Sequence, residues 1–155
     1  MAKEIERKFL ITGAFKTYAA KQTFIRQGYI STDPSRTVRV RTKGCDAFIT
    51  IKGLSNSTGV SRFEWEKRIP IEEAEDLFQF CLPGVIEKIR FEIPYKNHIF
   101  EVDEFFGKNL GLLIAEIELS SEDESFEKPS WLGEEVTGID KYYNSYLTSH
   151  PYTTW

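Results

Sequence analysis

Short segments that alternate charged with apolar residues run through this chain and limit what it can fold into. In one of them, Arg62, Glu64 and Glu66 alternate with Phe63 and Trp65. A period of two places charged side chains on one face of a β-strand and apolar side chains on the other. The pattern predicts eight strands, over residues 3–12, 22–30, 36–43, 46–53, 61–70, 84–95, 98–105 and 112–120.

Turn residues join several of these segments directly. Gly44 to Asp46 lies between two of them, and Lys96–Asn97 lies between another two. Short connections with glycine or asparagine are typical of β-hairpins. Evenly spaced strands joined in this way favour a closed antiparallel sheet. We therefore predict an eight-stranded antiparallel β-barrel.

Two further segments have the apolar spacing of helices. The first covers residues 71–82, and the second is expected to start after an N-cap at Thr137 and to end near Leu147. We expect these flanking helices to pack outside the barrel and to cover the apolar strand faces. The predicted fold class is thus α+β, in a single domain over residues 1–155.

Composition excludes several classes of function. The net charge of −4 disfavours a nucleic-acid binder that depends on overall positive potential. Cys45 and Cys81 lie far apart, so neither a zinc site nor a disulfide framework is indicated. The N-terminus has no apolar leader, and no run of eighteen apolar residues occurs. We expect a soluble cytoplasmic protein that does not bind membranes.

Two acidic pairs stand out among the charged strand faces. Glu4 and Glu6 share one face of the first strand, and Glu116 and Glu118 share one face of the last. Carboxylate oxygens suit Mg²⁺ or Mn²⁺, which bind through one or two carboxylates together with waters and phosphate oxygens. A single pair of this kind is more often a solvated strand face. The two pairs together, with basic partners on other strands, favour a metal site.

Basic residues are concentrated on other strands. The cations that share a face are Arg39 with Arg41 and Lys88 with Arg90, and single cations are Lys8 and Lys52. Arginine can hold phosphate oxygens with two parallel hydrogen bonds, whereas lysine acts as a compact charge. Cross-strand ion pairing with the acids is an equally good explanation for any single pair. If both sets of charges line the inside of a barrel, the interior has the chemistry needed for a metal-bound polyphosphate.

These motifs resemble those of the CYTH superfamily, the triphosphate tunnel metalloenzymes. Glu4-Ile5-Glu6-Arg7-Lys8 is similar to the ExExK signature that opens its members. The similarity runs nearly the full length and is closest to the short, single-domain bacterial type. The further matching segments are Gln27–Ser31, Thr37–Arg41, Thr50–Gly53, Phe63–Glu66, Ile86–Arg90, Glu101–Phe105, Ala115–Leu119 and Glu135–Thr137.

The resemblance implies roles for individual residues. Those that would bind the phosphates are Lys8, Arg39, Arg41, Lys52, Lys88 and Arg90. Those that would hold Mg²⁺ or Mn²⁺, directly or through water, are Glu4, Glu6, Glu64, Glu116 and Glu118. Lys88 would also orient or activate the attacking water, with Tyr29 beside it, so that Lys88, Glu4 and Glu6 form the expected catalytic set.

The activity implied by the resemblance is metal-dependent hydrolysis of inorganic tripolyphosphate to pyrophosphate and phosphate. Nucleoside or thiamine triphosphatase and adenylyl cyclase remain alternatives within the superfamily. A non-catalytic polyphosphate-binding module is the alternative from another class, and the two intact acidic pairs favour the enzyme over it. The chain contains no GxxxxGK[ST] motif, so a P-loop is excluded.

Overall fold

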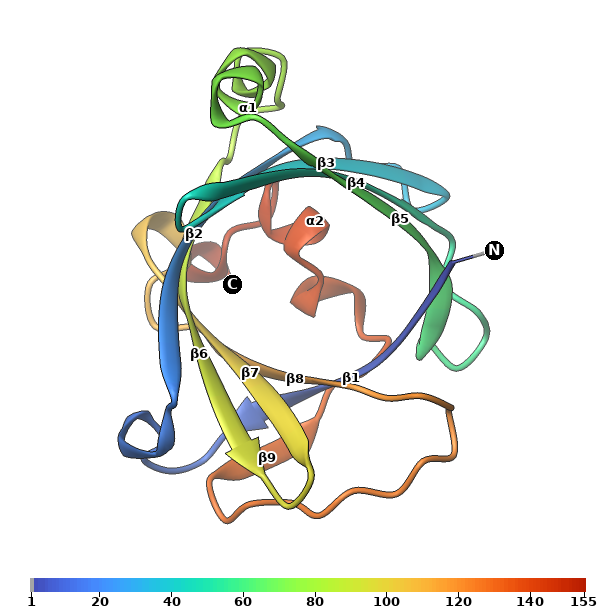
Figure 1. The fold of residues 1–155 in the computed structure, drawn as a ribbon, viewed down its shortest axis with the longest axis vertical. Coiled ribbons are helices and arrows are strands. Elements are labelled where there is room, and N and C mark those ends of the chain that lie inside the picture. Colours follow the sequence, from blue (N-terminus) through green and yellow to red (C-terminus); the bar gives the residue numbers. More distant parts are fainter. Residues whose placement is uncertain (1) are drawn as a thin grey trace.

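A computed structural model describes residues 2–155 as a closed antiparallel β-barrel (Figure 1). Eight strands follow one another around the barrel in the order β5-β4-β3-β2-β6-β7-β8-β1. Their bounds are β1 Lys3–Ile11, β2 Lys21–Ser31, β3 Arg36–Lys43, β4 Asp46–Gly53, β5 Ser61–Ile69, β6 Ile86–Tyr95, β7 His98–Phe105 and β8 Leu113–Glu118. The predicted fold class is confirmed, and every predicted strand lies within two residues of its observed bounds.

A short contact between the first and fifth strands closes the ring. Glu4 lies opposite Arg62, with Lys3–Phe63 and Ile5–Ser61 as the adjoining antiparallel pairs. A ninth strand, β9 (Leu132–Glu135), pairs with the second half of β1 and was not predicted. Four residues that include a glycine give too short an alternation to be recognised in the sequence.

The two predicted hairpins are present. Lys96 and Asn97 have φ values of 47° and 68°, the left-handed conformation that a two-residue hairpin turn requires. Gly44, with φ of 59°, turns the chain between β3 and β4. These turns fix the register of the paired strands, so side chains two residues apart on each strand face the same side.

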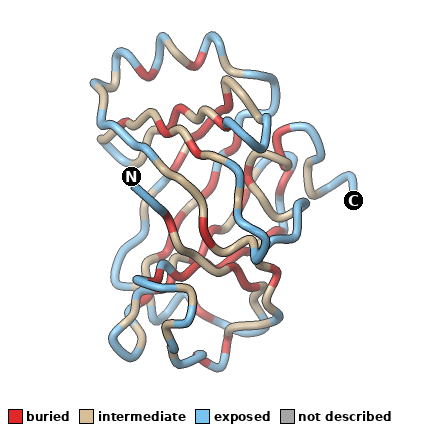
Figure 2. Tube along the Cα trace, turned by 90° about the vertical axis from the view of Figure 1, so that its right-hand side faces the viewer, coloured by how far each residue is buried: buried red, intermediate tan, exposed pale blue. Residues whose placement is uncertain are grey.

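Most of the barrel wall has its apolar face outside and its charged face inside; at one end Ile86, Phe105 and Ile114 lie on the inner face and pack with Leu147. The largest apolar cluster lies on the outer faces of β1, β6, β7 and β8, where Phe9, Phe91 and Phe100 are buried. Trp131, from the connection between β8 and β9, packs on the same cluster. Buried residues (red in Figure 2) therefore include apolar side chains of this outer cluster as well as charged side chains that line the interior.

Helix α1 (Ile71–Phe78) covers another part of the outer surface, across β3 and β4. Ala74 and Phe78 pack there against Val40 and Ala47. The predicted helix over 71–82 is too long, because the chain tightens into turns after Phe78 and the Leu82 amide donates to the Tyr29 carbonyl on β2. The remaining outer faces are covered mainly by irregular segments rather than by helices.

The second predicted helix is wrong in form and in position. The segment contains a 3₁₀ turn at Asp140–Tyr142 and a short α2 at Asn144–Leu147, separated by Tyr143 in an extended conformation. Thr137 is no N-cap, since its hydroxyl donates to Glu135 and accepts from the Lys8 amide. The C-terminal segment lies across one end of the barrel interior instead of outside it (Figures 1 and 2). No helix within residues 2–155 is long and apolar enough to cross a membrane.

Candidate active site

A polar cavity of about 170 Å³ occupies the barrel interior. That volume accommodates on the order of ten water-sized groups. Every site residue predicted from the sequence lines it. These residues are Glu4, Glu6, Lys8, Arg39, Arg41, Lys52, Glu64, Lys88, Arg90, Glu116 and Glu118. They come from six different strands, so only closure of the barrel brings them together.

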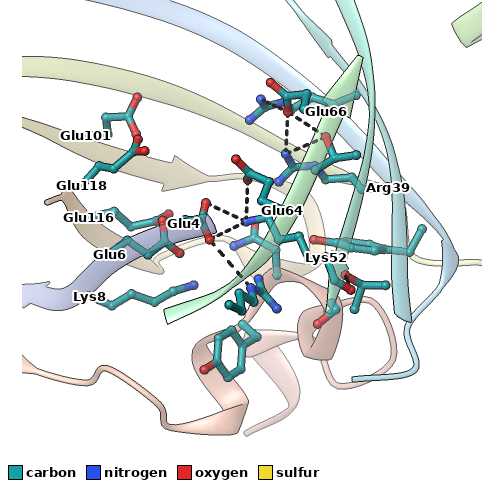
Figure 3. Close-up of a pocket in the computed structure, with 18 of the residues that line it drawn as sticks. Glu4, Glu6, Lys8, Arg39, Lys52, Glu64, Glu66, Glu101, Glu116 and Glu118 are labelled. Carbon is teal, nitrogen blue, oxygen red and sulfur yellow. Dashed lines mark hydrogen bonds and ion pairs between the residues drawn. The ribbon is translucent and has the colours of Figure 1, made fainter. Parts of the chain in front are cut away.

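Carboxylates from β1, β7 and β8 gather on one side of the cavity, as Figure 3 shows for Glu6, Glu116, Glu118 and Glu101. Burial, together with the nearby Glu116 and Glu4 charges, raises the pKa of Glu6 well above its usual range. Burial opposes ionisation of Glu116 as well, but Lys8, a hydrogen bond from Glu6 and Arg90 hold its pKa well below the usual range. Between these two side chains the protonated form is thus favoured on Glu6 and the ionised form on Glu116.

A second acidic pair joins β1 to β5. Burial opposes the ionisation of Glu4, but Lys52 and a hydrogen bond from Glu64 outweigh it and lower its pKa. Burial and the Glu4 charge raise the pKa of Glu64. Within residues 2–155 no three histidine, cysteine or acidic side chains converge as a ready-made metal site. The donor set still suits Mg²⁺ or Mn²⁺, which need only one or two carboxylates when phosphate and water supply the other oxygens.

Arg39 and Arg41 lie side by side on β3. Their guanidinium groups both reach the Glu66 carboxylate, at 3.5 and 3.3 Å, and Arg39 also donates to Thr50. The Nε atom of each arginine is buried without a hydrogen-bond acceptor. Burial and the neighbouring charges of Arg39 and Arg90 lower the pKa of Arg41 to about 9. Glu66 supplies the one carboxylate that pairs with both arginines, and their two Nε–H groups still lack an acceptor.

Lys52 and Arg62 enter the cavity from β4 and β5. The Lys52 ammonium lies 3.0 Å from Glu4 and 3.4 Å from Glu64, and Arg62 Nε lies 3.7 Å from Glu4. Lys8 has no ion pair within 4 Å among the described residues, although its amine lies 4.8 Å from the centre of the Tyr143 ring. Lys52 and Arg62 are thus paired with acids on neighbouring strands. This is the cross-strand ion pairing that was the alternative explanation of the sequence pattern.

Lys88 is the most buried cation of the cavity, with 1% of its surface exposed. Its ammonium contacts Asp103 Oδ2 at 2.8 Å and Asn144 Oδ1 at 2.8 Å. Arg90 holds both oxygens of the same Asp103 carboxylate, at 2.8 and 2.9 Å. Burial and the like charge of Arg90 lower the pKa of Lys88 to about 8, against the opposing attraction of Asp103 and Glu116. Lys88 can therefore exchange a proton near neutral pH.

Several residues that line the cavity were not among the site residues predicted from the sequence. Glu66, Glu101 and Arg62 follow from the same alternation that identified their neighbours. Tyr143 also lines the cavity, where its hydroxyl lies 3.4 Å from Ser55 Oγ. Asn144 follows it and also lines the cavity. No periodic signal marks this segment, because an extended residue and a four-residue helix have no repeating pattern.

Fold and cavity together define a β-barrel protein of the tunnel type. The chain belongs to the CYTH domain family, whose model matches residues 2–146. It is 46% identical to an inorganic triphosphatase of Acetivibrio thermocellus, over 98% of this chain and 97% of that protein. It is 36% identical to an inorganic triphosphatase of Nitrosomonas europaea, over 93% and 95% of the two chains. The family membership expected from the sequence is thereby confirmed.

Solved structures agree with this assignment. A crystal structure of an inorganic triphosphatase superposes with a TM-score of 0.67 at 33% identity and covers 96% of this chain and 95% of that one. A protein from Pyrococcus horikoshii OT3 superposes with a TM-score of 0.58 at 20% identity, over 77% and 81% of the two chains. The second likeness extends to the fold alone.

Proposed function

We propose that this protein hydrolyses inorganic tripolyphosphate to pyrophosphate and phosphate with the help of Mg²⁺ or Mn²⁺. The observation that carries the proposal is the charge distribution of the cavity. Arg39 and Arg41 retain buried donors without acceptors, and carboxylates of Glu6 and Glu116 lie in the same interior. An unsatisfied buried donor is costly, so an anion with many acceptor oxygens suits this corner. Family membership and the names of the two relatives support the same activity.

Different residues of the cavity bind the substrate, hold the metal and act on the attacking water. Lys8, Arg39, Arg41, Lys52 and Arg90 hold phosphate oxygens and fix the substrate, which is the main requirement for phosphoryl transfer to water. The divalent metal, held by Glu4, Glu6, Glu64, Glu116 and Glu118, neutralises phosphate charge when it is bound. Lys88 lies in the cavity, and its lowered pKa, about 8, makes the neutral amine accessible; in that form it orients the attacking water and accepts its proton, becoming the ammonium.

A second candidate, hydrolysis of an organic triphosphate, is favoured by one feature. A cavity of about 570 Å³ adjoins the tunnel and shares Arg62 and Tyr143 with it. Its lining is rich in hydroxyl groups and includes Leu54 and the stacked rings of Tyr146 and His150, 4.2 Å apart. A neutral organic group attached to the terminal phosphate would find room there, but few charges to bind more phosphate.

The two candidates differ in the expected substrate preference. We expect kcat/KM for tripolyphosphate to exceed that for ATP by at least about 10-fold, because an organic group without dedicated hydrogen-bond partners adds little binding. Phosphate release from both substrates, with Mg²⁺, with Mn²⁺ and without metal, measures this. Tyr146→Ser, a change in the adjoining cavity alone, should leave tripolyphosphate hydrolysis unchanged. A higher kcat/KM for ATP, lowered by Tyr146→Ser, would replace the inorganic substrate with an organic one.

The arginine pair provides a separate test of phosphate binding. Arg39→Ala or Arg41→Ala should raise KM for tripolyphosphate about 10- to 100-fold and change kcat less, because charge-assisted bonds to phosphate act in the bound ground state as well. Arg68→Ala is the matched control, since Arg68 lies on β5 but pairs with Asp46 at the surface. Steady-state kinetics of the three variants decide the matter. An unchanged KM in both tunnel variants would remove the arginine pair from the binding site.

A further inference from the structure

A series of hydrogen bonds between buried polar side chains reaches Lys88 inside the barrel. Gln27, on β2, is fully buried and donates from Nε2 to Asn144 Oδ1 at 2.9 Å. The same oxygen accepts from the Lys88 ammonium at 2.8 Å. Gln27 is absent from the lining of the cavity, whereas Asn144 and Lys88 both line it. The two hydrogen bonds therefore connect a buried residue that does not line the cavity to the proposed catalytic amine.

Hydrogen-bonding capacity fixes the direction of this series of hydrogen bonds. A lysine ammonium has three donors and no acceptor, so the Asn144 atom that faces it must be the amide oxygen. That oxygen has a second lone pair, and only the NH₂ group of Gln27 can satisfy it. The Gln27 oxygen is left buried without a partner. A buried group without a partner is costly, which indicates that the contact with Asn144 has a use beyond stability.

The contacts of Lys88 also divide into two kinds. Asp103 holds the ammonium with a charged oxygen, but it shares both carboxylate oxygens with Arg90. Asn144 supplies a neutral acceptor from a different part of the chain, the α2 helix at the end of the tunnel. Two acceptors occupy two of the three N–H groups and leave one for the cavity. The amine is thus restrained without a second full negative charge beside it.

We propose that Asn144, held by Gln27, is a positioning residue that fixes the Lys88 amine for the reaction. The inference rests on the proposed function, in which Lys88 acts on the attacking water. It makes the C-terminal segment part of the machinery rather than only a cover for the tunnel. It also assigns a role to Gln27, which is buried and does not line the cavity.

Kinetics of apolar variants test the proposal. Asn144→Leu should lower kcat about 10- to 100-fold and Gln27→Leu about 3- to 10-fold, with KM within about 3-fold of its original value, since each change removes a hydrogen bond that matters to geometry more than to binding. The double variant should have a kcat only slightly below that of Asn144→Leu alone. Gln27 and Asn144 belong to one series of hydrogen bonds, so the effects of the two substitutions are not additive. The proposal would be overturned if the substitutions raised KM and left kcat unchanged, or if kcat were unchanged in Gln27→Leu.

Thr148→Val is the matched control. Thr148 is buried on the same segment and bonds to the backbone carbonyl of Asn144, not to its side chain. The kcat of Thr148→Val should stay within about 2-fold of the original value. Loss of the Thr148 hydroxyl leaves the hydrogen bonds between the side chains of Gln27, Asn144 and Lys88 intact. If Thr148→Val lowered kcat as much as Asn144→Leu does, both changes would merely loosen the C-terminal segment, and the positioning role would be overturned.

A measurement independent of turnover separates this inference from the proposed function. The ¹⁵N signal of the Lys88 ammonium, assigned by its loss in Lys88→Arg, reports hydrogen bonding in the unliganded protein. It should shift or broaden in Asn144→Leu and Gln27→Leu and stay unchanged in Thr148→Val. An unchanged signal in Asn144→Leu would overturn the positioning role. Absence of tripolyphosphate hydrolysis by the unsubstituted protein would instead refute the proposed function, and the ¹⁵N signal would still decide whether Asn144 holds Lys88.

Discussion

Replacing Glu116 by Gln should lower kcat/KM for tripolyphosphate by at least about 1,000-fold, because a bound metal contributes several kcal/mol to the stabilisation of transition-state charge. The amide keeps the shape of the side chain and removes the charge that Lys8 and Arg90 hold ionised in the cavity. Glu4→Gln should behave in the same way. Phosphate release at increasing Mg²⁺ and Mn²⁺ concentrations measures the effect, and thermal unfolding checks that the fold is retained.

The matched control is Glu87→Gln. Glu87 is exposed on the outer face of β6, one residue before the proposed catalytic lysine. Its substitution should leave both activity and metal dependence unchanged. Full turnover by Glu116→Gln and Glu4→Gln at ordinary metal concentrations would show that these carboxylates hold no metal. Activity restored only at high metal concentration would instead support their assignment.

The second large effect is expected at Lys88. Lys88→Ala should lower kcat about 100-fold or more while KM changes much less, because a positioned proton acceptor acts mainly in the transition state. Asp103 keeps its bidentate partner Arg90 in this variant, so no buried carboxylate is left unpaired. Lys88→Met, which fills more of the space, is the control for packing. If either variant raised KM alone, Lys88 would be one more phosphate ligand.

The pH profile identifies the protonation state that Lys88 uses. The profile of kcat/KM reports groups of the free enzyme. Because the pKa of Lys88 is lowered to about 8, its neutral form increases as pH rises through that value. The activity should therefore rise through pH 8, and Lys88→Arg, which stays charged, should lose this rise. A rise that persists in Lys88→Arg would assign the titration to another group.

Local pattern was sufficient for most of the fold. Alternation along each strand depends only on neighbouring residues, so Arg62, Glu64 and Glu66 indicated a strand with one charged face before any tertiary contact was known. The hairpin at Lys96–Asn97 is equally local, because its conformation follows from the turn residues. The family motifs added the inference that the charged faces lie inside a barrel.

Tertiary structure decided how the charges are partnered. In the sequence, Arg39 and Arg41 could equally have been paired or available, and only the barrel shows that they share Glu66 and keep unpaired Nε atoms. It also decided the place of Asn144, whose partner Gln27 lies 117 positions earlier in the chain. Contacts of that separation leave no periodic trace, since periodicity records the face of a local element and not what that face meets.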